Sequence, residues 1–211
     1  MAIQTQGFGG VVDEVDSTFR ARRVSIRPTE VLAWLSYGGV STGLTGVAAA
    51  GAVFSLRNIS TNLVIVRRVQ VGFVTTTAFT TAQGLAYKLN VARAFTASDS
   101  GQNPVSFTGN NMKHRTSLAQ LTNADMRQSG SGAITAGTRT LDTNAVGFVS
   151  GNSTGLATGM FIQSLFQHDT GDYPLVLAQN EGIVIINDLA MGAAGVINLY
   201  ITIEFAEAAT F

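Results

Sequence analysis

The segment Gly151-Asn152-Ser153-Thr154-Gly155 is the part of the chain whose residue types and spacing most resemble a catalytic motif. It matches G-x-S-x-G, in which a strand, a sharp turn and a helix expose a nucleophilic serine, with an acid and then a histidine further along the chain. His168 is the only histidine after Ser153, and no Asp or Glu lies between the two. Gly159 also interrupts the helix that should follow the serine. The segment therefore predicts a Gly/Ser loop and no nucleophile.

Histidines and cysteines, the usual metal ligands, are scarce in this chain. It has two histidines and no cysteine, whereas a structural zinc site takes four nitrogen or sulfur ligands at characteristic spacings. His168 with Asp169 and Asp172 falls short of that number, and His114 stands alone. A cluster of acidic residues near the N-terminus lacks the full pattern of a calcium-binding loop: Asp13, Glu14 and Asp16. We therefore expect no metal ion and no cofactor.

A pair of carboxylates is another arrangement that could do chemistry, here the hydrolysis of a glycoside. Glu181 falls in a predicted turn, and Glu204 and Glu207 lie on or after the last predicted strand. Pairing of these carboxylates across the fold is not visible in their spacing along the chain. Sugar sites also stack their ligands on aromatic rings, and Trp34 is the only tryptophan. We predict no catalytic, cofactor-binding or metal-binding residue, and no enzyme.

Composition describes a chain with ample material for a core and a weakly charged surface. Of 211 residues, 45% are hydrophobic and 12% are charged, about half the usual charged share of a soluble domain. The 13 basic and 13 acidic residues cancel, so little electrostatic repulsion keeps copies apart. We expect other subunits to cover much of this surface.

The charge balance also argues against nucleic acid, because its binders normally carry a basic excess or stripe. The arginine-rich residues 20–27 directly follow the acidic residues 13–16, and we expect both to form a solvated or intersubunit segment.

No basic region followed by an apolar run begins the chain. No apolar stretch approaches the roughly 18 residues of a membrane span. We expect a protein made in the cytoplasm, with no nucleic-acid or membrane partner.

Alternation of apolar and polar residues is the clearest structural pattern in the chain. In the last strand, the odd positions from Ile197 to Phe205 are large and apolar, while Asn198, Thr202 and Glu204 between them are polar. A strand with one buried face requires this period of two. Alternating or β-branched apolar runs predict strands at residues 53–56, 63–77, 85–95, 175–177, 183–186 and 196–205. Residues 146–149 are the candidate strand before the G-x-S-x-G segment.

Three further segments have weaker patterns. Residues 30–37 predict one short helical turn or an irregular strand, ended by Gly38-Gly39. Residues 112–126 predict a short helix. Gly72 predicts a bulge or bend within its strand. Residues 175–177 and 183–186 are spaced as two strands joined by a short connection.

Many strands, short turns and no long amphipathic helix predict an all-β fold. We expect an antiparallel two-sheet β-sandwich, jelly-roll-like in the first place and immunoglobulin-like in the second. Residues 1–30 lack periodicity and combine a glycine-rich start with opposite charge blocks, so we expect an extended N-terminal arm. Residues 31–211 should form a single β-sandwich domain.

Several blocks of residues resemble those of a group of tailed-bacteriophage virion proteins. They are Pro28–Leu32, Val53–Arg57, Val71–Phe73 with Thr75–Gln83, Ala92–Gly101, Gly109–Asn111, Ala136–Leu141 and Leu177–Gly182 with the terminal strand. The resemblance spans most of the chain after residue 20. It implies a structural component of a phage particle, and it implies no activity and no catalytic residue.

Pattern and resemblance together lead us to expect a non-enzymatic structural protein of a bacteriophage virion, foremost a head decoration or cement protein that stabilises subunit junctions. It should associate with itself and with other virion proteins, the major capsid protein among them. A tail or neck ring subunit is the first alternative. The second is a glycan-recognising receptor-binding module, in which exposed aromatics such as Tyr37 or Tyr173 would stack on sugars.

Overall fold

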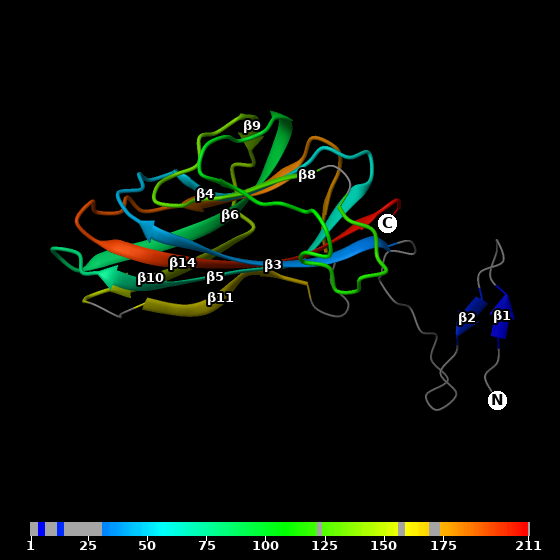
Figure 1. Ribbon diagram of the computed structural model, residues 1–211, viewed down its shortest axis with the longest axis horizontal. Coiled ribbons are helices and arrows are strands. Elements are labelled where there is room, and N and C mark those ends of the chain that lie inside the picture. The colour runs from blue at the N-terminus through cyan, green and yellow to red at the C-terminus, as the bar shows by residue number, and fades with distance from the viewer. Residues whose placement is uncertain are drawn as a thin grey trace.

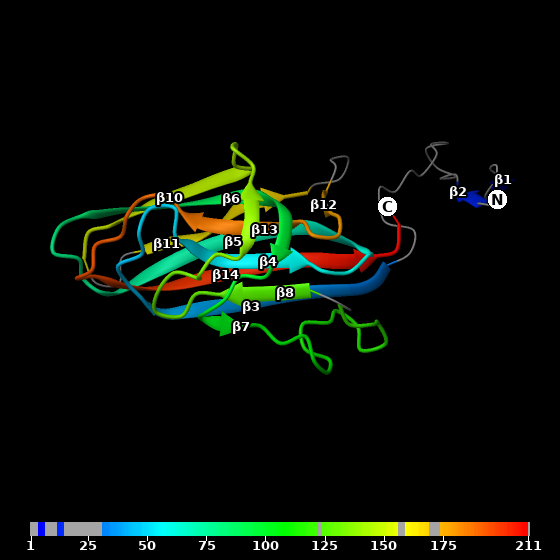
Figure 2. The same cartoon turned by 90° about the horizontal axis from the view of Figure 1, so that it is seen from above.

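The computed structural model describes residues 4–6, 12–14, 31–121, 124–155, 159–168 and 174–210. Within those ranges the protein is all-β, and its two large antiparallel sheets form a sandwich (Figures 1 and 2). No helix among these residues is long and apolar enough to cross a membrane. The strands are β1 (Gln4–Gln6), β2 (Val12–Glu14), β3 (Val31–Leu44), β4 (Ala52–Asn58), β5 (Leu63–Thr77), β6 (Gln83–Ala97), β7 (Asn103–Pro104), β8 (Ala124–Gln128), β9 (Thr138–Leu141), β10 (Gly147–Ser153), β11 (Gly159–Gln167), β12 (Leu175–Leu177), β13 (Gly182–Asn187) and β14 (Val196–Ala208).

One sheet has five strands and the other has seven. The five-stranded sheet runs β11-β5-β14-β3, and β12 continues the edge of β5 beyond β11. The seven-stranded sheet runs β10-β6-β13-β4-β8-β7, and β9 pairs with the far half of β6. The two-sheet sandwich expected from sequence is therefore present, while its jelly-roll order stays a prediction.

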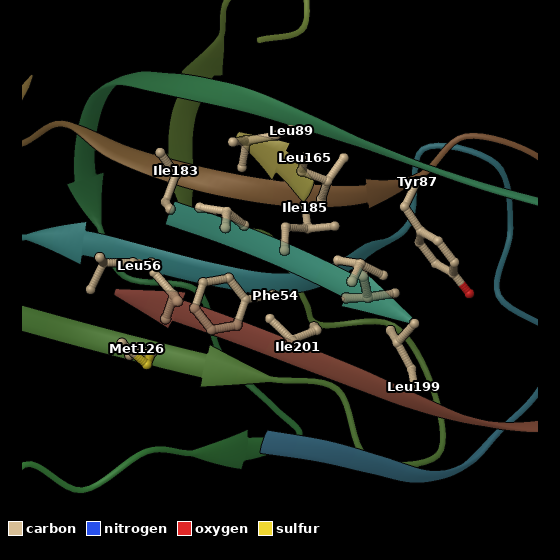
Figure 3. Packing of buried hydrophobic residues seen from close by; sticks show 14 of the residues in the cluster. Phe54, Leu56, Tyr87, Leu89, Met126, Leu165, Ile183, Ile185, Leu199 and Ile201 are labelled. Atoms are coloured by element: carbon tan, nitrogen blue, oxygen red, sulfur yellow. The ribbon is translucent and has the colours of Figure 1, made fainter. Parts of the chain in front are cut away.

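The core lies between the sheets and follows the alternation seen in the sequence. In β14 the five apolar odd positions from Ile197 to Phe205 are at most 1% exposed. They meet side chains of the opposite sheet such as Phe54, Tyr87 and Ile185 (Figure 3). All six residues of β13 are buried, because Ile134 and its neighbours pack on the outer side of that strand. Period-two burial thus holds the two layers together.

Close backbone contact seals the sandwich where β10 and β11 meet. A Cβ atom added to Gly147 of β10 would overlap the carbonyl oxygen of Leu165 in β11. Glycine is therefore required there by a close approach of two backbones and not by an unusual φ angle.

At the opposite side of the sandwich, the side chain of Gln128 in β8 connects the two sheets through hydrogen bonds to β3. Its amide oxygen accepts hydrogen bonds from the backbone N–H groups of Val40 (3.2 Å) and Ser41 (3.0 Å) in β3, and its nitrogen donates to the hydroxyl of Tyr37 (2.5 Å). The hydroxyls of Ser41 and Ser129 lie 2.9 Å apart beside it. A side-chain amide thus occupies N–H groups that an edge strand would otherwise present to solvent.

Several expectations about individual elements are wrong. Residues 112–126 contain no described helix; turns are followed by strand β8. Strand β3 continues through Gly38-Gly39, since its long pairing with β14 outweighs the local preference of glycine for turns. The irregularity near Gly72 lies in the neighbouring strand β11, where Ile162 packs over the missing side chain.

Strands β12 and β13 are present as predicted but do not pair with each other. β12 joins β5 in one sheet, whereas β13 lies between β4 and β6 in the other. The short connection between them therefore crosses from one layer of the sandwich to the other.

Tyr87 provides a test of the core energetics. Its side chain is fully buried and its hydroxyl has no hydrogen-bond partner among the described residues. An unmade buried hydrogen bond costs about 1–3 kcal/mol, so Tyr87→Phe should raise the free energy of unfolding by about 1 kcal/mol in urea titrations.

Tyr87 also predicts how the stability of the fold changes at alkaline pH. Burial raises the pKa of Tyr87 far above its ordinary value of 10.0, so above pH 10 the unfolded chain loses a proton that the folded chain keeps. Stability contributed by this group is complete below pH 10 and falls as the pH rises further. Tyr87→Phe should flatten that fall; an unchanged alkaline slope would contradict the assignment.

Candidate assembly surface

The G-x-S-x-G segment forms part of a strand. Gly151, Asn152 and Ser153 end β10 and pair with the start of β6. Ser153 is 1% exposed, and its Oγ lies 2.6 Å from Oγ1 of Thr75 in the other sheet. The predicted loop is wrong for these three residues, and the serine serves as a polar contact between the sheets.

The histidines lie on different elements. His114 is a surface residue whose Nε2 lies 2.6 Å from Oγ of Ser36, and its ring stacks on Trp34 with centroids 6.2 Å apart. His168 lies at the end of β11, and its backbone N–H donates to the carbonyl of Arg67 (2.7 Å). No group of three His, Cys, Asp or Glu within the described ranges could hold a metal ion. Asp169, Asp172 and Asp16 lie outside the described residues.

The three glutamates considered for glycoside chemistry are separately engaged. Glu204 contacts Arg67 and Arg68 on the outer face of the five-stranded sheet. Glu207 is fully buried, and its Oε1 accepts from Nδ2 of Asn62 (2.7 Å). Glu181 pairs with Arg93 at the seven-stranded sheet. Each carboxylate has a local structural partner.

Four of the sequence blocks that carry the resemblance meet around the ring of Phe95. The guanidinium carbons of Arg57 and Arg139 lie 5.7 and 5.3 Å from the ring centroid. Arg57 also donates to Oδ1 of Asn180 (3.1 Å). The cluster therefore joins β4, β6, β9 and the turn before β13, and it gives these blocks a role in holding the fold together.

The same cluster contains a buried ion pair that sequence reasoning missed. Asp99 accepts hydrogen bonds from Nη1 of Arg139 and from the backbone N–H of Gly137 (2.8 Å). The side chains of Asp99 and Arg139 are 0% and 6% exposed. Arg93 forms a more exposed neighbouring pair, and its pKa is raised by its hydrogen bonds to Glu181 and Asp142.

The outer face of the five-stranded sheet carries an apolar patch, which we define as Val40, Val74, Ile162 and Tyr200. These side chains are between 38% and 54% exposed. They come from all four strands of the main path, and the pairing of Tyr200 with both Val40 and Gly72 places them in one region. Sequence spacing did not predict this patch, because its four side chains come from strands far apart in the chain.

Glycine and uncharged polar residues surround the apolar patch. The outward row next to Tyr200 contains Gly38, Thr202 and Gln70, and a Cβ on Gly38 would meet no atom within 4 Å. The result is a shallow hollow lined by Gly38, Gly39, Val40, Ile162, Tyr200, Ile201 and Thr202. We call it the apolar hollow. Its surface suits contact with another apolar surface.

A second hollow lies further along β14 on the same face. It is lined by Arg67, Arg68, Gln167, His168 and Glu204, and we call it the basic hollow. A bulge produces it, because Glu204 pairs with Arg68 and Phe205 with Val66, which leaves Arg67 as an extra residue. A bulge re-aims side chains, so both arginines reach Glu204, at 3.3 and 3.5 Å.

Tyr37 is not the exposed stacking aromatic expected for a glycan site. Its ring packs against Phe54 with centroids 6.2 Å apart, and its hydroxyl contacts Gln128. Burial raises the pKa of the Tyr37 hydroxyl above its ordinary value of 10.0. Tyr173 lies outside the described residues.

Comparison with known proteins identifies no family. No family model and no curated protein matches the chain. Among solved structures, one titled "Structure of infectious bursal disease virus Gt strain" aligns with 97% of this chain at 13% identity and a TM-score of 0.16. The alignment covers 50% of that chain, so this chain spans about half its length.

Proposed function

We propose that the chain is a non-enzymatic structural protein of a bacteriophage virion, which decorates the head and stabilises junctions between its subunits. The observation that carries the proposal is the apolar patch on the five-stranded sheet, which has no charged side chain in its own row or in the row containing Gly38 and Thr202. The sequence blocks that resemble tailed-bacteriophage proteins support the same role.

The side chains that could have done chemistry also support a structural role. Ser153 bonds across the sandwich, Glu204 is held by arginines, and Glu207 is buried against Asn62. These contacts stabilise the folded chain. An extended sheet face, in contrast, presents the kind of broad and nearly flat surface that protein partners cover.

Self-association tests the apolar patch directly. Wild-type protein should form a defined oligomer or assemble with concentration, as measured by light scattering after size-exclusion chromatography over a hundredfold range. Tyr200→Glu places a charge in the patch and should weaken the association at least tenfold, since burying an unpaired charge is costly. Phe148→Ser is the matched control, because Phe148 is 66% exposed on the other sheet. Equal association of wild type and Tyr200→Glu would reject the patch as the contact.

Particle association tests the virion role itself. The chain should sediment with purified particles of the phage that encodes it, and mass spectrometry should detect it at many copies per particle. Antibody labelling on the head would support decoration, whereas labelling on the tail would favour the ring-subunit alternative. A chain absent from washed particles would overturn the proposed function.

A further inference from the structure

The basic hollow contains more positive than negative charge. Arg67 and Arg68 contribute two positive charges against the single negative charge of Glu204, which leaves an excess of one. Each guanidinium has five N–H donors, and Glu204 takes up only part of them. The two guanidiniums therefore retain N–H donors that Glu204 does not engage.

Two polar atoms of the residues that line this hollow are themselves buried. Nε of Arg68 and Nδ1 of His168 are inaccessible to solvent and have no hydrogen-bond partner among the described residues. The hollow measures about 120 Å³, well below the roughly 300–1,000 Å³ of pockets for small-molecule ligands. Its volume suits one acidic side chain.

We infer that the occupant is the acidic segment of the N-terminal arm of a second copy of this chain, with Glu14 in the basic hollow. This inference rests on the proposed assembly role. Asp13, Glu14 and Asp16 form a dense acidic cluster in the sequence, so its charge is complementary to that of the arginines. An Arg–carboxylate contact is among the strongest charge-assisted hydrogen bonds.

The neighbouring apolar hollow fits the residues beside the acidic cluster. Residues two apart in an extended strand are separated by about 6.8 Å. Val12 and Glu14 are two apart, as are Thr202 and Glu204 on β14, which line the apolar and the basic hollow. An arm lying along β14 therefore brings Val12 to the open space above Gly38 when Glu14 reaches the arginines.

The chain also provides the length and the exit point for such a contact. Strands β1 and β2 pair only with each other among the described strands, so neither sheet of the same copy takes them up. Glu14 and Val31 are 17 positions apart in the sequence, a reach of up to about 56 Å. Strand β3 begins beside the end of β14, with Val31 opposite Ala208, near the basic hollow.

Charge reversal on each side tests the contact. Asp13→Lys/Glu14→Lys and Arg67→Glu/Arg68→Glu should each weaken self-association at least tenfold, measured by light scattering with the full chain. Combining all four substitutions in one chain should restore most of the self-association. Arg115→Glu is the control, since Arg115 is exposed outside both hollows. Far-ultraviolet circular dichroism verifies that each variant is folded. Wild-type association in both reversed variants would overturn the inference.

Mixing the two charge-reversed variants shows whether the arm docks on another copy or on its own copy. The arm variant keeps an intact hollow and the hollow variant keeps an intact arm, so their mixture should form hetero-oligomers that neither forms alone. Absence of hetero-oligomers, together with rescue in the quadruple variant, would mean that the arm folds back on its own copy and would overturn the exchange. If Tyr200→Glu abolishes association while both reversed variants assemble normally, the inference fails and the proposed function stands.

Discussion

Replacing Asp99 with alanine is expected to lower the free energy of unfolding by about 3–5 kcal/mol, because it leaves the guanidinium of Arg139 buried without its counter-ion. Both side chains are almost fully shielded from solvent. The substitution also removes the acceptor of the Gly137 N–H. Urea titration followed by circular dichroism measures the loss.

Two further variants distinguish the effect of an unpaired buried charge from a nonspecific destabilisation of the fold. Asp99→Ala/Arg139→Met removes both charges and should recover part of the loss, since a missing pair is less costly than half a pair. Asp142→Ala breaks the more exposed pair with Arg93 and should cost less than about 1 kcal/mol. A loss below about 1 kcal/mol for Asp99→Ala would show that the buried pair does not hold β6 and β9 together.

Gly147→Ala is expected to have the second-largest effect, a loss of about 3 kcal/mol. The added methyl group overlaps the backbone oxygen of Leu165, and a backbone atom cannot rotate away as a side chain can. Relief requires β10 and β11 to separate, at the upper end of the usual 1–3 kcal/mol for overpacking or above it. The shift of the thermal midpoint measures the loss.

Gly84→Ala is the matched control for this substitution. Gly84 belongs to β6, the strand that pairs with β10, and a Cβ there would lie 3.5 Å from Cδ1 of Leu189. That is an ordinary van der Waals contact, so the change should stay within about 0.5 kcal/mol. Equal effects for Gly147→Ala and Gly84→Ala would contradict the close approach of β10 and β11.

Local periodicity in the sequence predicts strands well, because alternation is a property of consecutive residues. The predicted bounds of β5 agree with the structure at both ends, and the buried positions of β14 follow the expected parity. Residues 112–126 mislead because spaced apolar residues also occur in irregular loops that cover a core. Local pattern does not report which sheet a strand joins, so the short connection between β12 and β13 gives no sign that they belong to different sheets.

The candidate surfaces depend on pairing across long distances in the chain and were therefore not predictable from spacing. Asp99 and Arg139 are 40 residues apart, and no motif links them. Arg67 and Arg68 read as one inward and one outward residue of a regular strand, whereas the bulge opposite Glu204 brings both to one hollow. The apolar patch takes one side chain from each of four strands, which lie far apart in the sequence.

The amide of Gln128 has a consequence for the protein at high concentration. A strand edge with free N–H groups can template the addition of further strands and grow into a fibril. In β3 the N–H groups of Val40 and Ser41 are already occupied by that amide. At high concentration these two N–H groups are therefore closed to a strand of another copy.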